Sequence, residues 1–275
     1  MPIEEQEIEA LASRVLTAGD AHTSIAPITD AQSEFDLAAA YDVAARIAHR
    51  RVARGERPVG WKIGFTNDSI WAQQGLNAPI WARMYDTTVA EVDPADGAAC
   101  PVGGLNEPRI EPEIGLRLAQ VPDPDMDEAA LLACVDAVTH GFEIVLSLYP
   151  GWRLKPADAV AAFGMHGLYR HGPLVPVLPA ERERWLQMLG DFTVVLFRDG
   201  VEMDRGAGTN VLGGPLSALR HFARNLEKYP GHTLSPGDLI TTGTLTRALP
   251  IAPGERWSTK LEGIPLPGMD LALTA

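Results

Sequence analysis

Apolar side chains recur at helical spacing in two stretches close to the N-terminus. One stretch covers residues 3–18 and the other residues 36–54, and in both the apolar positions lie three or four residues apart. Gly55 and Pro58 follow the second stretch and mark its end. The pattern therefore predicts two amphipathic helices, with the residues between them forming a loop.

Beyond residue 58 the apolar positions come in short runs separated by proline and glycine. Strands are expected at residues 59–65, within 80–92, at 109–120, 141–149 and 239–242, and in the last forty residues. Asp199 and Gly200 stand between two alternating runs, which is typical of a type I′ hairpin. The other expected elements are a helical turn at 67–76, helices at 127–139 and 215–228, and a Pro/Gly-rich linker at 93–104.

The order of these elements indicates the fold class. Helical patterns precede the strands, and helices and strands do not alternate regularly along the chain. This order argues against a parallel sheet built from βαβ units and predicts an α+β fold. We expect an N-terminal helical segment, residues 1–56, followed by a β-rich domain, residues 57–275.

Composition limits the class of protein further. With 46% hydrophobic and 21% charged residues, the 275-residue chain has the balance of a globular protein. Its formal net charge of −13 disfavours nucleic acid and anionic membranes as partners. No apolar run approaches a membrane span, and the acidic N-terminus lacks the features of a signal peptide. Cys100 and Cys134 fit no zinc motif, so a cytoplasmic protein is expected.

Three glutamates stand in runs that are otherwise apolar. On a strand, Glu111 and Glu113 project from the same face, and Glu143 lies within another apolar run. Burying three carboxylates is unfavourable unless a cation neutralises them, and hard divalent cations take oxygen ligands. The alternative is a solvated strand face on which neighbouring arginines pair with the glutamates. Pro112, between the first two, indicates a sheet edge, a bulge or a site.

Lys62 and a glycine-containing run are further candidates. Lys62 lies on a predicted strand with a glycine on either side, at residues 60 and 64. It is either a peripheral lysine or a group that transfers a proton or holds a carboxylate. Residues 241–246 (TTGTLT) form a simple turn or offer hydrogen-bond donors to an anion.

Taken together, these segments resemble the fumarylacetoacetate hydrolase superfamily, in particular the branch of 2-oxopent-4-enoate (2-hydroxypentadienoate) hydratases and 4-oxalocrotonate decarboxylases. The motifs that carry the resemblance are GWKIGFTN (60–67), RIEPEIGLRL (109–118), GFEIV (141–145), VLGGPLSALRHFARNL (211–226) and LSPGDLITTGTLT (234–246). The resemblance implies a fold in which helices precede a mixed, mostly antiparallel β-roll or sandwich. It also implies a homo-oligomer.

The resemblance implies the roles of individual residues. It assigns Glu111, Glu113 and Glu143 as ligands of Mg²⁺ or Mn²⁺, and Lys62 as the catalytic lysine. A small 2-oxo acid would bind to this cation while Lys62 transfers a proton. The residues expected to bind the substrate are Arg109, Thr242, Gly243 and Thr244.

The chain departs from the family pattern at Ile80. This residue follows Pro79, where hydratases and decarboxylases of the family typically carry an acidic residue. We predict that His166 replaces it as the second acid or base, with His140 as the alternative, and Glu107 is expected beside the site. The residues expected near the substrate tail, for each of which core packing is the alternative, are Trp71, Trp81, Tyr85, Phe163 and Met165.

The predicted activity is that of a carbon–oxygen lyase. It would add water to a 2-oxo-alkenoate or 2-hydroxydienoate in the catabolism of ring compounds. A 2-oxo acid decarboxylase or a C–C hydrolase on the same scaffold is one alternative. A divergent metal-binding member of the family with little turnover is another, and the departure at Ile80 motivates it.

Overall fold

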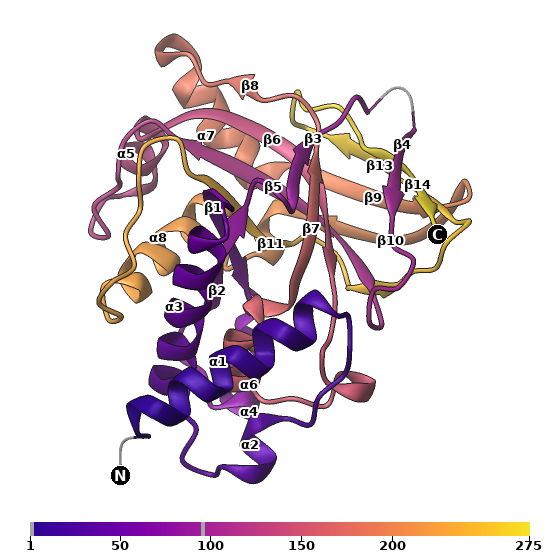
Figure 1. Ribbon diagram of the computed structural model, residues 1–275. Coiled ribbons are helices and arrows are strands. Elements are labelled where there is room, and N and C mark those ends of the chain that lie inside the picture. The colour runs from indigo at the N-terminus through magenta and orange to yellow at the C-terminus, as the bar shows by residue number, and fades with distance from the viewer. Residues whose placement is uncertain (1–2, 95–96) are drawn as a thin grey trace.

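Two β-sheets and a set of helices make up the protein, as a computed structural model describes it for residues 3–94 and 97–275 (Figure 1). Among these residues the larger sheet has nine strands in the order β2-β1-β11-β5-β6-β7-β3, with β12 beside β5 and β8 beside β6. Its strands are β1 (Pro58–Gly64), β2 (Ile80–Tyr85), β3 (Val89–Glu91), β5 (Arg109–Leu118), β6 (Val135–Val145), β7 (His166–His171), β8 (Val175–Pro176), β11 (Leu239–Thr244) and β12 (Leu249–Pro250).

The smaller sheet has five strands among the same residues, in the order β10-β9-β13-β14-β4. They are β4 (Ala98–Pro101), β9 (Thr193–Arg198), β10 (Val201–Ala207), β13 (Arg256–Glu262) and β14 (Asp270–Thr274). Phe142 and Ile144 of β6 share a buried cluster with Trp257 and Leu271 of this sheet. One face of β6 therefore packs on the second sheet, and the alternate residues, Glu143 among them, face the other way.

Helices cover the remaining surfaces of the larger sheet. They are α1 (Glu5–Asp20), α2 (Ile28–Ala31), α3 (Leu37–Ala53), α4 (Trp71–Gln74), α5 (Glu128–Ala133), α6 (Pro156–Ala161), α7 (Arg182–Asp191) and α8 (Pro215–Leu226). The two long N-terminal helices, α1 and α3, pack on each other, and α3 also packs on α6 (Figure 1). Their buried side chains belong to the same core as those of β1 and β2. The division of the chain at residue 56 stays a prediction. No helix of the described residues has the length and apolar character needed to cross a membrane.

Several predicted elements are present with small shifts in their ends. The two N-terminal helices correspond to α1 and α3, and Asp36 caps α3 by accepting a hydrogen bond from the Ala39 amide. Asp199 and Gly200 have φ values of 51° and 77°, as a type I′ turn requires, and they join β9 to β10.

The helix predicted at 127–139 is wrong in its second half. Helix α5 ends at Ala133, and the chain then enters β6 at Val135. Residues from Val135 onward pair with β5, and the β-branched Val138 and Thr139 fit a pleated, buried surface. Tertiary pairing thus overrides a local pattern that is compatible with a helix.

The linker predicted at 93–104 also contains a strand. Residues 95 and 96 lie outside the described part of the chain. The end of the linker forms β4, which pairs in parallel with β14. Pairing with a strand from the other end of the chain has no local signal in the sequence.

Pro112 lies in the middle of the larger sheet and not at an edge. Its strand, β5, runs between β11 and β6, and Pro112 is aligned with Phe142. On the other side the register with β11 shifts between Thr241 and Thr244, and the Pro112 carbonyl accepts a hydrogen bond from Leu245 N at 2.9 Å. The proline therefore occupies an irregularity in the ladder, where its missing N–H is tolerated.

Candidate metal centre and active site

Three glutamates converge on one face of the larger sheet. Glu111 and Glu143 are register partners across β5 and β6, and Glu113 lies two residues further along β5. One carboxylate oxygen from each of the three lies within 4.8 Å of the others. Glu113 and Glu143 are fully buried, whereas Glu111 is half-buried. The alternation of side chains along paired strands produces this cluster directly.

The charge of this cluster is not balanced by the protein alone. Burial raises the pKa of Glu111 to about 7 despite the nearby charge of Lys62. Burial and the charges of Glu143 and Glu111 raise the pKa of Glu113 well above its usual value. Burial opposes ionisation of Glu143 as well, but Lys62 and His166 outweigh it and lower that pKa to about 2. Like-charged carboxylates this close ionise together only if a further cation joins them.

The donor set fits a divalent cation. Glu113 Oε1 is buried and accepts no hydrogen bond from any described residue, so it has a lone pair available for a ligand. Its other oxygen, Oε2, accepts a hydrogen bond from Gly243 N at 2.9 Å, which orients the carboxylate. An all-oxygen site of this kind suits a hard ion such as Mg²⁺ or Mn²⁺.

Lys62 projects from β1 toward the three carboxylates. Its Nζ lies 3.1 Å from Glu143 Oε2 and donates a hydrogen bond to the Gly164 carbonyl at 3.1 Å. Burial lowers the pKa of this amine, but the charges of Glu143, Glu111 and Glu113 more than compensate and raise it. Lys62 also lines the cavity described below.

His166 contacts Glu143 from the neighbouring strand, β7. Its Nδ1 lies 2.7 Å from Glu143 Oε1, and its Nε2 lies 2.9 Å from Thr88 Oγ1. Because the Glu143 carboxylate only accepts, we assign the proton to Nδ1, and Nε2 then accepts from the Thr88 hydroxyl. Burial lowers the pKa of His166, which favours this neutral tautomer.

This arrangement changes the role expected for His166. Sequence reasoning put it forward as a second acid or base, but both ring nitrogens are engaged with protein groups and the ring does not line the cavity. The contacts of His166 are those of a group that orients the Glu143 carboxylate.

His140 belongs to the packed core between the sheets and not to the site. It lies an odd number of residues from Glu143 on β6, so its side chain points to the opposite face. Its Nδ1 is 2.9 Å from the Glu113 carbonyl and its Nε2 is 2.8 Å from Thr259 Oγ1. Burial lowers its pKa to about 4, so it is a neutral, hydrogen-bonded core histidine.

Of the three predicted substrate-binding residues on β11, one reaches the cavity with its side chain. Thr244 lines the cavity, whereas Thr242 is buried and its hydroxyl donates to the Ile114 carbonyl at 3.1 Å. Gly243 has φ of +99°, and a Cβ there would lie 2.1 Å from Thr66 Oγ1. Only glycine fits, and this close approach presents its N–H to Glu113.

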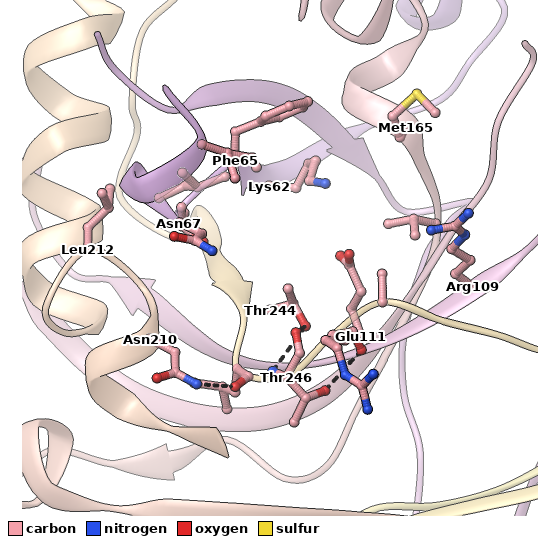
Figure 2. A pocket seen from close by; sticks show the side chains of 18 of the residues that line it. Lys62, Phe65, Asn67, Arg109, Glu111, Met165, Asn210, Leu212, Thr244 and Thr246 are labelled. Atoms are coloured by element: carbon pink, nitrogen blue, oxygen red, sulfur yellow. Dashed lines mark hydrogen bonds between the residues drawn. The ribbon is translucent and has the colours of Figure 1, made fainter. Parts of the chain in front are cut away.

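A cavity of about 1000 Å³ opens in front of Lys62 and Glu111. Figure 2 shows Lys62 of β1 and Arg109 and Glu111 of β5 around the same cavity. The Arg109 guanidinium lies 4.2 Å from the ring centre of Trp152, and no carboxylate among the described residues forms an ion pair with it. This arginine is therefore free to bind an anionic group.

Sequence reasoning missed much of the remaining lining. Phe65, Asn67, Trp152, Asn210 and Leu212 are among the additional residues that line the cavity. Phe65, Met165 and Leu212 have φ values of 57°, 66° and 54°, a conformation that side chains other than glycine rarely adopt. Nothing in the local sequence signals these positions.

Most of the residues predicted to lie near the substrate tail do not line the main cavity. Met165 lines the cavity, but Trp81, Tyr85 and Phe163 line a separate, much smaller cavity of about 30 Å³. Trp71 does not line the main cavity, and its Nε1 donates to the Phe65 carbonyl at 2.7 Å. All four aromatic residues therefore lie outside the main cavity.

Two further positions do not line the cavity. Glu107 does not line the cavity, and its Oε1 accepts a hydrogen bond from Gly151 N at 2.8 Å. Ile80 is buried in the core beside Gly64. An apolar side chain thus occupies the place of the acidic residue expected from the family pattern.

Comparison with known proteins supports the same class of site. The fumarylacetoacetate (FAA) hydrolase C-terminal family matches residues 71–266. The 2-keto-4-pentenoate hydratase of Paraburkholderia xenovorans (strain LB400) is 30% identical over 94% of this chain and 93% of that protein. The 4-oxalocrotonate decarboxylase of Pseudomonas sp. (strain CF600) is 30% identical over 94% of each chain.

The same fold is found in a solved structure. The 4-oxalocrotonate decarboxylase from Pseudomonas putida G7, complexed with magnesium and adipate, superposes with a TM-score of 0.88 at 28% identity, covering 98% of each chain. The chain therefore belongs to the fumarylacetoacetate hydrolase family. The α+β fold expected from the sequence resemblance is confirmed.

Proposed function

We propose that this protein is a divalent-metal-dependent lyase that hydrates a 2-oxo-alkenoate or 2-hydroxydienoate formed in the breakdown of ring compounds. The observation that carries the proposal is the cluster of the carboxylates of Glu111, Glu113 and Glu143 beside Lys62, of which Glu111 and Lys62 line the cavity. The hydratases among the relatives, including the 2-hydroxyhexa-2,4-dienoate hydratase of Comamonas testosteroni at 29% identity, support it.

Glu111, Glu113 and Glu143 are the residues that would hold the cation. The buried Glu113 oxygen without a hydrogen bond and the raised pKa values of Glu111 and Glu113 support this assignment. Structures of related proteins contain magnesium or calcium, which supports a divalent ion, and we propose Mg²⁺ or Mn²⁺. When bound, the ion supplies positive charge that stabilises the negative charge developing on the oxygen of a 2-oxo acid.

Lys62 is the proton carrier in this proposal. Its ammonium is held by the Gly164 carbonyl and by Glu143, and it faces the cavity in which the substrate binds. From this position the ammonium delivers a proton to the carbon skeleton of the substrate, and the neutral amine that results takes a proton back. Because these two contacts already hold the ammonium in place, little conformational entropy is lost when it reacts.

Other residues of the cavity bind and orient the substrate. Arg109 binds a carboxylate through its guanidinium, which has no anionic partner in the described chain. Thr244, Asn67 and Asn210 offer polar groups along the wall. Phe65, Met165 and Val145 give the hydrocarbon part of the substrate an apolar surface.

A decarboxylase is the second candidate. The 4-oxalocrotonate decarboxylase from Pseudomonas putida G7 that shares this fold was crystallised with adipate, a dicarboxylate, and the free Arg109 would suit a second carboxylate. A C–C hydrolase on this scaffold, or a divergent metal-binding member with little turnover, accounts for the same site. The buried Ile80 favours the last of these, because it removes an expected acidic group.

Product analysis separates these activities. The purified protein with Mn²⁺ is given 2-hydroxypenta-2,4-dienoate and 4-oxalocrotonate in ¹⁸O-labelled water. Label in the C4 hydroxyl of the product of the first substrate supports the hydratase, because the C2 carbonyl exchanges its oxygen with water unaided, and release of CO₂ from the second supports the decarboxylase. Absence of turnover on a wider panel of 2-oxo-enoates, by a protein that binds Mn²⁺, contradicts both.

The setting of the enzyme is part of the proposal. We infer a cytoplasmic homo-oligomer whose partner is a small 2-oxo acid, with no role for nucleic acid or a membrane. The net charge of −13 supports the absence of nucleic acid and membrane partners, because it repels polyanions and anionic lipid. Sedimentation and size-exclusion measurements test the oligomeric state.

A further inference from the structure

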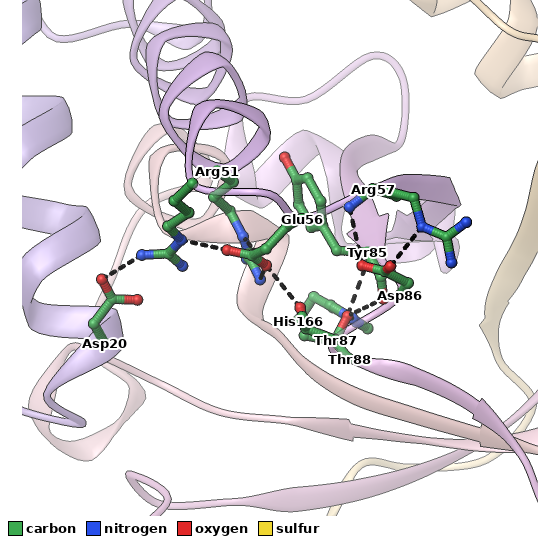
Figure 3. A network of polar contacts seen from close by, with 10 residues as sticks. Asp20, Arg51, Glu56, Arg57, Tyr85, Asp86, Thr87, Thr88 and His166 are labelled. Atoms are coloured by element: carbon green, nitrogen blue, oxygen red, sulfur yellow. Dashed lines mark hydrogen bonds and ion pairs between the residues drawn. The ribbon is translucent and has the colours of Figure 1, made fainter.

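A buried carboxylate at the end of the N-terminal helical segment anchors a turn that reaches the site. Glu56 follows α3 and is 9% exposed. Its Oε2 accepts hydrogen bonds from Arg51 Nη2 at 2.6 Å and from Thr87 Oγ1 at 2.6 Å, and Arg54 binds its other oxygen. Figure 3 shows these contacts converging on Glu56 from the helix and from the turn.

The turn between β2 and β3 connects this anchor to His166. Thr87 contacts Glu56, and the adjacent Thr88 contacts His166 Nε2 through its hydroxyl at 2.9 Å. The backbone of the turn is also fixed on the side of β7, where Arg170 Nη1 donates to the Thr88 carbonyl at 2.8 Å. Thr88 is thus held between the helix and the strand that carries the histidine.

His166 completes the path to the carboxylate cluster. Its Nδ1 lies 2.7 Å from Glu143 Oε1, while Lys62 occupies the other oxygen of Glu143 at 3.1 Å. With Thr88 on one ring nitrogen and Glu143 on the other, rotation of the imidazole breaks both contacts. The orientation of Glu143 therefore depends on the placement of Thr88.

We propose that Glu56 is a positioning residue for the cation site, acting through Thr87, Thr88 and His166 on the Glu143 carboxylate. Glu56 does not line the cavity and is not part of the carboxylate cluster. It also lies outside residues 71–266, the part of the chain that matches the family. The inference rests on the proposed function, because it assumes that the three glutamates bind a divalent ion.

The size of the effect follows from the distance along this path. Mutation of groups that orient a metal ligand typically weakens metal binding by roughly 10–100-fold. Thr88 orients the histidine directly, so loss of its hydroxyl should cost about tenfold in Mn²⁺ affinity. Glu56 acts through Thr87 and is two residues further along the path than Thr88, so we expect a weakening of roughly three- to tenfold for Glu56→Gln.

The alternative is that Glu56 only fastens α3 to the rest of the protein. Glu9 offers a matched control for that role. It too receives two arginines, Arg46 and Arg50, and it joins α1 to α3, but none of its contacts reaches the turn. Glu9→Gln should lower the unfolding temperature somewhat and leave Mn²⁺ affinity unchanged.

The experiment is a Mn²⁺ titration of the full chain, followed by the electron paramagnetic resonance signal of the free ion. The proteins are wild type, Glu56→Gln, Thr87→Val, Thr88→Val, Thr88→Ser and Glu9→Gln. We expect weaker binding in Glu56→Gln and Thr88→Val, near wild-type binding in Thr88→Ser, which keeps the hydroxyl, and wild-type binding in Glu9→Gln. Thermal unfolding of each variant is recorded in parallel.

The outcomes separate the possible failures. Wild-type protein that binds no Mn²⁺ overturns the proposed function, and this inference with it. Wild-type protein that binds, together with a Glu56→Gln variant of unchanged affinity, overturns the inference alone. If Glu56→Gln does not fold, Thr87→Val decides in its place, because Thr87 is exposed and loses only the hydroxyl that contacts Glu56.

Discussion

Glu111 and Glu143 lie directly opposite each other on β5 and β6, so two acidic side chains are neighbours on the same face of a buried sheet. Like charges directly across a strand pair are destabilising. The pair is accompanied by the fully buried Glu113, and a single lysine, Lys62, contacts the group. Such a cluster lowers the stability of the folded protein when no cation is bound, and binding of a cation raises that stability again.

Replacement of Glu113 by Gln should separate binding from stability. The variant removes a carboxylate whose pKa is raised by burial and by its acidic neighbours, so the metal-free protein should be at least as stable as wild type. Loss of a direct ligand should weaken Mn²⁺ binding by more than the roughly 100-fold reached by mutations around a ligand. Calorimetric titration checks this, and an unchanged affinity would remove Glu113 from the site.

Replacement of Lys62 by Met should stop turnover without preventing metal binding. The methionine fills similar space but has no proton to transfer, so kcat should fall by roughly 10²–10⁴-fold. Mn²⁺ affinity should be equal or higher, since a positive charge 3.1 Å from Glu143 is gone. Steady-state kinetics and a parallel Mn²⁺ titration measure the two effects. Wild-type kcat in this variant would reduce Lys62 to a packing role.

Replacement of Arg109 by Met should weaken substrate binding. A hydrogen bond between charged groups contributes about 1.5–3 kcal/mol, so KM for a 2-oxo acid should rise roughly 10–150-fold. Mn²⁺ affinity should change little. Arg198→Met is the control, because that guanidinium also lies over a tryptophan, Trp257, but on the second sheet. Equal effects of both variants on KM would contradict the assignment of Arg109.

The free energy of unfolding should depend on pH through the ionisation of Glu56. Burial raises the pKa of this carboxyl, but hydrogen bonds from Arg51, Thr87 and Arg54 outweigh that and lower it from 4.5 to about 2. Because the folded pKa lies below the unfolded value, the unfolded state binds the proton more tightly. The contribution of Glu56 is therefore complete above pH 4.5 and disappears as pH falls toward 2.

The measurement compares urea unfolding of wild type and Glu56→Gln across this pH range. The shift corresponds to about 3 kcal/mol at most at neutral pH, and to less in so far as solvent screens these contacts. The difference in free energy of unfolding between the two proteins should be largest near pH 7 and shrink steadily below pH 4.5. A difference that stays constant from pH 7 to pH 3 would show that the ionised carboxylate contributes nothing specific.

The cluster of three glutamates could be predicted from the sequence because much of its signal is local. Glu111 and Glu113 are two residues apart on an apolar strand, and alternation places them on one face whatever the rest of the chain does. Glu143 needs the correct pairing of two strands, but its apolar neighbours already indicate burial. Lys62 was singled out because it too is a charged residue between apolar neighbours on a predicted strand.

The support around these residues could not be predicted, because it depends on contacts between distant segments. Thr88 and Glu56 reach His166 only when a turn, a helix and β7 are brought together, and β7 itself was not predicted. The side-chain direction of His140 was also hidden until the face of β6 was known. The start of β6 was misread as helix because pairing with β5 decides it.

The most direct test of the account is a crystal of the protein soaked in MnCl₂ and oxalate, with diffraction data collected at the manganese absorption edge. We predict one strong anomalous peak among the carboxylates of Glu111, Glu113 and Glu143, with oxalate on the cavity side beside Lys62 and Arg109. A map with no anomalous density between the three carboxylates, from crystals in which they are well ordered, would contradict the central claim.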